Sequence, residues 1–99
     1  MLPNPRFTLG RLLITPAARS RLEEVGISPS RLVERHLCGD WGCVDDDDWR
    51  SNNAGLASGE RLFSAYDVDD PRGPIWIITE RDRSATTILL PDEYQQATE

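Results

Sequence analysis

The stretch RLFSAYDV at residues 61–68 decides the fold class, because the pattern of apolar residues changes there. Even-numbered residues such as Leu62 and Tyr66 alternate with the odd-numbered ones, which is the period of two expected of a β-strand. Before Gly59 the apolar residues recur at helical spacing instead. The chain is therefore expected to be α+β, with about three N-terminal helices followed by a sheet.

Two further strands are expected after this one. The turn-forming segment 69–74, DDPRGP, separates it from the strand at residues 75–79, which is nearly all apolar and therefore central. The next strand covers residues 84–90 and ends at Pro91, since proline cannot donate to the ladder. Residues 7–14 could add a short strand or form an extended arm. We expect an antiparallel sheet of three to four strands.

Three helices are expected upstream, each with a starting signal and a glycine just past its end. A hydroxyl N-cap followed by proline opens the first at Thr15-Pro16 and the second at Ser28-Pro29. The third begins in the acidic run at residues 45–48, whose carboxylates interact favourably with the helix dipole. The residues expected to face the core are Ala18, Leu22 and Val25, then Leu32, Val33, His36 and Leu37, and then Trp49, Asn53 and Leu56.

A length of 99 residues predicts one domain, with residues 1–6 and 95–99 loosely held. No apolar run approaches the roughly 20 residues of a membrane span, and residues 1–5 do not have the pattern of a signal peptide. We therefore expect a cytoplasmic protein that does not associate with membranes. Cys38 and Cys43 are expected to be free thiols in that compartment.

The net charge of −6 is unevenly distributed along the chain. Residues 1–36 carry a charge of about +3, and residues 37–99 carry about −9. An acidic surface repels the nucleic-acid backbone but suits a basic protein partner. The residues that we expect to contact such a partner are Asp45, Asp46, Asp47, Asp48 and Trp41.

The only histidine lies close in sequence to two cysteines and an aspartate. His36, Cys38, Asp40 and Cys43 could nominally supply the four ligands that zinc requires. Their spacing matches no standard pair of ligand motifs, and no second cluster exists elsewhere in the sequence. We expect a helix end followed by a loop anchored by Trp41, with no metal and no cofactor.

An alternative is a small metal-free ribonuclease or toxin. His36 or Glu80 would then transfer protons, and Arg81 or Arg83 would stabilise the phosphate. Helices followed by an antiparallel sheet also resemble, remotely, the barnase/RelE type of ribonuclease fold. The competing interpretation is an ordinary sheet with polar residues on its solvated face.

A second alternative is a helix-turn-helix DNA binder. The spacing from Leu22 through Gly26 to Leu32 fits that motif, and Arg31 and Arg35 would face the DNA. The acidity of the whole chain argues against it.

Several stretches together resemble a family of small bacterial proteins carried on plasmids and integrative elements. The members are labelled plasmid-related proteins or, by automatic labelling, restriction-enzyme subunits. The resemblance spans nearly the whole chain and rests on LG (9–10), ITPAA (14–18), RHL (35–37), GDWG (39–42), RLFSAY (61–66), WIITE (76–80), DRS (82–84) and TTILLP (86–91). It implies no particular chemistry, and the chain has neither the glycine motif nor the length of a methyltransferase.

The expected function is therefore a non-enzymatic, acidic protein–protein interaction module of a mobile genetic element. Its partner would be a host or element-encoded protein, for example a nucleic-acid-handling or defence enzyme. The two alternatives, a ribonuclease and a DNA binder, remain open at this point.

Overall fold

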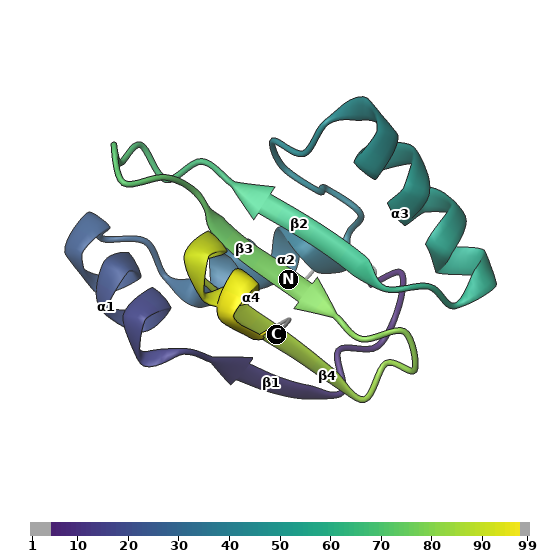
Figure 1. The fold of residues 1–99 in the computed structure, drawn as a ribbon. Helices are drawn as coiled ribbons and strands as arrows, with labels where there is room; N and C mark the ends of the chain where they lie inside the picture. The colour runs from purple at the N-terminus through teal and green to yellow at the C-terminus, as the bar shows by residue number, and fades with distance from the viewer. Residues whose placement is uncertain (1–4, 98–99) are drawn as a thin grey trace.

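The computed structural model describes residues 5–97 of the chain (Figure 1). It contains, in chain order, β1 (Arg11–Ile14), α1 (Pro16–Val25), α2 (Pro29–Leu37), α3 (Asp46–Ser58), β2 (Leu62–Tyr66), β3 (Ile75–Thr79), β4 (Ala85–Leu89) and α4 (Pro91–Ala97). The expected α+β class is confirmed. Within these residues no helix is long and apolar enough to cross a membrane.

The strands form one four-stranded sheet in the order β1-β4-β3-β2. β2, β3 and β4 are antiparallel neighbours, with Phe63 opposite Ile78 and Ile77 opposite Ile88. β1 instead runs parallel to β4. The sheet is therefore mixed and not antiparallel as expected. Of the two alternatives for residues 7–14, the short strand is the one that forms, so a strand precedes the helices. The long chain between β1 and β4 permits the parallel pairing, because parallel neighbours need a long connection.

The helix ends lie where their capping residues predict. Thr15 Oγ1 accepts a hydrogen bond from the N–H of Ala18 at 3.1 Å, and Asp45 Oδ1 accepts one from the N–H of Asp48 at 2.8 Å. Gly26 and Gly59 end α1 and α3 in the left-handed conformation, with φ of 74° and 77°. These local signals set the lengths of the first and third helices.

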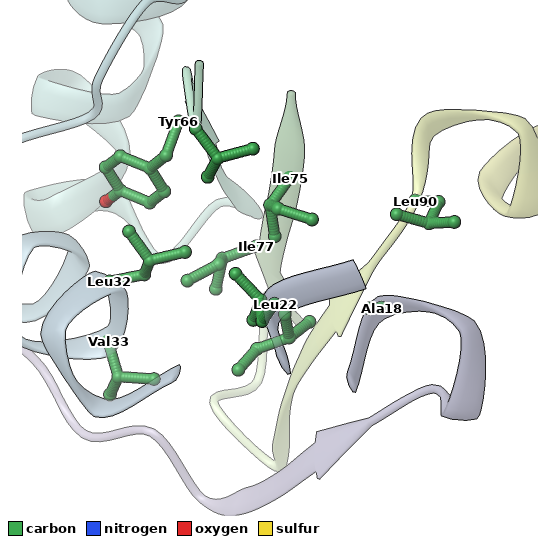
Figure 2. Packing of buried hydrophobic residues seen from close by; sticks show 10 residues of the cluster. Ala18, Leu22, Leu32, Val33, Tyr66, Ile75, Ile77 and Leu90 are labelled. Atoms are coloured by element: carbon green, nitrogen blue, oxygen red, sulfur yellow. The ribbon is translucent and has the colours of Figure 1, made fainter. Parts of the chain in front are cut away.

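The core lies between α1, α2 and one face of the sheet (Figure 2). α2 crosses behind the sheet in Figure 1, while α4 lies in front of it. The stripes expected in α1 and α2 are confirmed. The buried apolar cluster comprises Ala18, Leu22, Leu32, Val33, Tyr66, Val68, Ile75, Ile77, Ile88 and Leu90.

α3 buries a different face from the expected one. The predicted stripe was Trp49, Asn53 and Leu56, but the buried residues are Asn52 and Gly55. The amide of Asn52 accepts from the N–H of Phe63 at 3.0 Å and donates to its carbonyl at 2.6 Å. α3 therefore packs against the outer edge of β2 through hydrogen bonds, which a pattern of apolar residues does not indicate.

The tail expected after Pro91 is a helix. Proline is suited to the first helical turn, so Pro91 both ends the strand and opens α4. Glu93 Oε1 accepts from the N–H of Leu90 and from Thr15 Oγ1, both at 2.8 Å. Residues 95–97 belong to α4, and the N–H of Arg6 donates to the carbonyl of Leu37 at 2.8 Å. Residues 1–4 and 98–99 lie outside the described part.

Candidate functional site

His36 lies in the core between α2 and the sheet, and it is 0% exposed. Its Nδ1 lies 2.5 Å from Ser64 Oγ, and its Nε2 lies 2.9 Å from Thr79 Oγ1. Thr79 Oγ1 is in turn 2.8 Å from Thr86 Oγ1, which donates to the carbonyl oxygen of Leu9 at 2.8 Å. The imidazole thus lies within a buried hydrogen-bonded chain, running from Ser64 to the carbonyl of Leu9, that joins α2, three strands and the N-terminal arm.

The direction of each hydrogen bond in this chain follows from its last acceptor. The Leu9 carbonyl can only accept, so the hydroxyl proton of Thr86 is committed to it. Thr79 must then donate to Thr86, and Nε2–H of His36 must donate to Thr79. A neutral ring with its proton on Nε2 leaves Nδ1 to accept from Ser64. Every member is satisfied only when His36 is neutral.

Burial, and secondarily the positive charge of Arg83, lower the pKa of His36 to about 3. The native state therefore resists a proton that the unfolded chain binds near pH 6.5. The contribution of neutral His36 to the free energy of unfolding is therefore fully present above that pH. It is lost as the pH drops from about 6.5 towards about 3. Between pH 7 and 5.5, where carboxylates stay ionised, we expect a loss of about 1.2 kcal/mol, measured by urea unfolding. A flat profile over this interval would contradict a buried neutral imidazole.

The residues of the ribonuclease hypothesis do not form one site. His36 is enclosed, whereas Glu80 is exposed in the loop between β3 and β4. Arg81 is exposed and pairs with Glu60 at 2.8 Å. The Arg83 guanidinium donates to the carbonyls of Glu60 at 2.7 Å and Gly55 at 3.0 Å. Arg83 thus joins the end of α3 to the hairpin instead of facing an open phosphate site.

The two arginines of the helix-turn-helix hypothesis lie on α2, whose opposite face is buried against the sheet. Arg35 forms an ion pair with Asp40 at 2.7 Å and lies 4.6 Å from the centre of the Tyr66 ring. This ion pair holds the pKa of the Asp40 carboxyl below its usual value. Arg31 is exposed beside Glu34 in an open pocket of about 350 Å³. The arginines therefore lie among carboxylates.

The four aspartates predicted to contact a partner surround the start of α3. Asp45 caps the helix, and Asp46, Asp47 and Asp48 form its first turn, all of them exposed. Partial burial, together with the charges of Asp45 and Asp47, raises the pKa of Asp48. We call these four residues the acidic start of α3. Their carboxylates can meet cationic side chains of another molecule.

Trp41, predicted as an interaction residue, lies inside the protein instead. Its side chain is 0% exposed, and its Nε1 donates to Asn53 Oδ1 at 3.0 Å. Its backbone carbonyl accepts from the N–H of Ala65 at 3.1 Å. Trp41 therefore anchors the loop before α3, as expected if the segment holds no metal, and its side chain does not face a partner.

A pocket of about 210 Å³ opens on the sheet face that carries α4. We call it the aromatic pocket; it is lined by Asp48, Arg61, Phe63, Trp76, Ile78 and Tyr94. The Phe63 and Trp76 rings meet edge to face at 4.8 Å, and Trp76 and Tyr94 do so at 5.8 Å. Arg61 donates to the Tyr94 hydroxyl. Because Asp48 lines it, the pocket adjoins the acidic start of α3.

No pattern in the sequence predicts this pocket as a whole. The alternation in β2 does place Phe63 on the face opposite Leu62 and Tyr66, so one wall was visible in the pattern. Tyr94 was not, because its position depends on α4. Within residues 5–97, no three His, Cys, Asp or Glu side chains are arranged to hold a metal ion, and Cys38 and Cys43 are unpaired.

The chain was compared with protein-family models, curated proteins and solved structures, and none of them matches it.

Proposed function

We propose that the chain is a non-enzymatic protein-interaction module that binds a basic partner over the aromatic pocket and the acidic start of α3. The observation that carries this proposal is the pocket itself. It places Phe63, Trp76 and Tyr94 around one cavity, with the carboxylate of Asp48 at its margin. Pockets with aromatic walls hold the anchor residues that dominate protein–protein affinity.

The charges around the pocket favour a protein over a nucleic acid. Four carboxylates at the start of α3 repel phosphate, and the whole chain carries −6. The same carboxylates attract lysine and arginine and accelerate the encounter with a basic surface. An apolar side chain of the partner would enter the pocket, while neighbouring cations would meet Asp46 and Asp47.

An enzyme that handles nucleic acid fits this description, because its substrate groove is basic. The resemblance to plasmid and integrative-element proteins leads to the same class of partner, a host or element-encoded nucleic-acid-handling or defence enzyme. The free thiols of Cys38 and Cys43 are compatible with the cytoplasm, where such enzymes act.

The inward orientation of the polar residues also supports a non-enzymatic role. Acid–base catalysis requires a titrating group within hydrogen-bond reach of the substrate. Both ring nitrogens of His36 are bonded to buried hydroxyls, and a pKa of about 3 means that the ring stays neutral and takes up no proton near neutrality. Arg83, one of the two arginines that the ribonuclease hypothesis places on the phosphate, is engaged with backbone carbonyls.

Affinity capture with tagged variants tests the proposal. The wild-type protein should retain a partner at stoichiometric yield after nuclease treatment, read by quantitative mass spectrometry. The double variant Asp46→Asn/Asp47→Asn should weaken that complex roughly 2- to 30-fold at physiological salt, since each exposed ion pair contributes about 0.2–1 kcal/mol. Tyr94→Ala, which removes one wall of the aromatic pocket, should weaken it further.

A matched control has the same change in net charge elsewhere. Glu23→Gln/Asp92→Asn removes two exposed carboxylates from other helices, Glu23 from α1 and Asp92 from the first turn of α4. It should leave binding unchanged. If both double variants lose affinity equally, overall charge and not the acidic start of α3 is responsible. If capture is lost on nuclease treatment, the partner is a nucleic acid and the proposal fails.

A further inference from the structure

The two edge strands of the sheet, β2 and β1, differ in whether their outward-facing backbone groups are hydrogen-bonded within the chain. At the β2 edge, Asn52 bonds both backbone groups of Phe63. At Ala65, the carbonyl of Trp41 and the N–H of Cys43 supply the partners, at 3.1 and 2.7 Å. Four successive edge groups of β2 are thus occupied from within the chain, which prevents this edge from pairing with another strand.

The β1 edge has no such cover among the described residues. β1 is the outermost strand, and Figure 1 shows no labelled helix or strand beyond it. The N–H of Arg11 donates to the carbonyl of Ser84, just before β4, and the N–H of Thr15 donates to the carbonyl of Ile88 in β4, at 3.0 Å each. In a parallel pair, alternate residues face the neighbouring strand, so the backbone groups of Leu12 and Ile14 face outwards.

β1 also carries the large apolar side chains that are exposed in the described part of the chain. Leu12 is 50% exposed and Leu13 is 40% exposed. They lie on opposite faces of the sheet, since successive residues of a strand alternate. An extended, apolar and uncovered edge is a template for another strand.

We propose that β1 pairs antiparallel with β1 of a second copy of this chain, which joins the two four-stranded sheets into one. The two copies would be related by a two-fold axis normal to the sheet. This assembly goes beyond the proposed function and does not depend on it, because the aromatic pocket lies towards the opposite edge of the sheet, on β2 and β3.

The register follows from which groups face outwards. A two-fold axis normal to the sheet keeps each face of one copy continuous with the same face of the other, so residues of equal parity must be opposed. With Leu13 opposite the partner's Leu13, Leu12 of each copy lies opposite the partner's Ile14. Each of these two residue pairs, one on either side of the axis, exchanges two backbone hydrogen bonds. A register centred on Leu12 would instead require Gly10, whose φ of 64° is not extended.

Charge complementarity in this register favours a second copy over a foreign strand. Arg11 would lie opposite the partner's Thr15, on the sheet face that α4 covers. The hydroxyl of Thr15 donates to Glu93 Oε1 at 2.8 Å, so the Glu93 carboxylate lies next to Thr15. Each Arg11 therefore meets the partner's Glu93, and the edge is complementary to itself in hydrogen bonds, apolar contacts and charge.

Sedimentation equilibrium at about 0.15 M salt, where repulsion between the acidic copies is screened beyond about 8 Å, tests the assembly. The wild-type chain should shift from monomer to dimer with concentration. Leu13→Lys places two ammonium groups against each other at the axis and should weaken dimerisation at least tenfold. Arg11→Glu should also weaken it. Ala57→Lys, at an exposed position of α3, is the control and should leave the dissociation constant unchanged.

Cysteine cross-linking tests the register itself. In a background of Cys38→Ser and Cys43→Ser, Leu13→Cys should form a disulfide-linked dimer under mild oxidation, because directly opposed residues at a non-hydrogen-bonded site lie close enough to bridge. Leu12→Cys should not, since it faces the partner's Ile14. A chain that stays monomeric up to about 1 mM overturns the proposal and leaves the edge to a foreign strand. A dimer that survives Leu13→Lys and cross-links through Leu12→Cys overturns it as well.

Discussion

Replacing His36 with alanine should lower the free energy of unfolding by about 3–5 kcal/mol, a large share of the stability of a domain this small. The change leaves a cavity under α2 and removes the edge contacts of the ring with Phe7 and Trp41, at centroid distances of 5.2 and 5.5 Å. It also leaves Ser64 and Thr79 without their partner in the core. Urea denaturation followed by tryptophan fluorescence gives the value.

A set of size-conserving variants separates the two causes. His36→Phe fills the cavity but strips the hydrogen bonds, so it should remain clearly less stable than the wild type. Adding Ser64→Ala and Thr79→Val removes the two hydroxyls left without the imidazole and should recover part of the loss, since replacing both partners of a hydrogen bond by apolar groups costs little. If His36→Phe alone is as stable as the wild type, the hydrogen-bonded chain contributes nothing and the ring acts only by its volume.

The elements that could be predicted from the sequence are those fixed by nearby residues. The cap at Thr15 and the stop at Gly26 act within one helical turn, so α1 has the predicted bounds. The apolar run at residues 75–79 predicted a central strand, and β3 lies between β2 and β4. Burial on both sides requires such a run, and this requirement is visible without knowing the neighbours.

The elements that were mispredicted depend on distant partners. β1 runs parallel to β4, with Leu12 opposite Thr86, and no pattern within residues 7–14 specifies the direction of a neighbour so far along the chain. The buried face of α3 is set by the hydrogen bonds of Asn52 to Phe63, and an amide carries no apolar signal. In both cases tertiary pairing decided what local periodicity could not.

The candidate site divides in the same way. The acidic start of α3 was visible because four adjacent aspartates need no fold to be recognised. The core-facing position of His36 was visible in the helical stripe, but its chemistry was not, since only the packed sheet brings Ser64 and Thr79 to its two nitrogens. Trp41 illustrates the converse: it was predicted among the residues that contact a partner, but its side chain is 0% exposed.

Gly42→Ala should be more damaging still, with an expected loss of more than about 4 kcal/mol and no folded protein at moderate temperature. Gly42 has a φ of 79°, and an added Cβ would overlap the carbonyl oxygen of Ala65 and lie 2.8 Å from Cδ1 of Tyr66. The loop cannot retreat, because the neighbouring residues Trp41 and Cys43 are both hydrogen-bonded to Ala65.

Gly59→Ala is the matched control for the left-handed backbone. Its φ of 77° is nearly the same, but nothing lies within 4 Å of an added Cβ, so it should lose only the conformational cost of about 1–2 kcal/mol. The difference between the two variants in chemical denaturation therefore measures the close approach of the loop to β2. Equal losses would mean that the segment around Gly42 moves freely. In that case the closure of the β2 edge by this loop, and with it the contrast with β1, would not hold in solution.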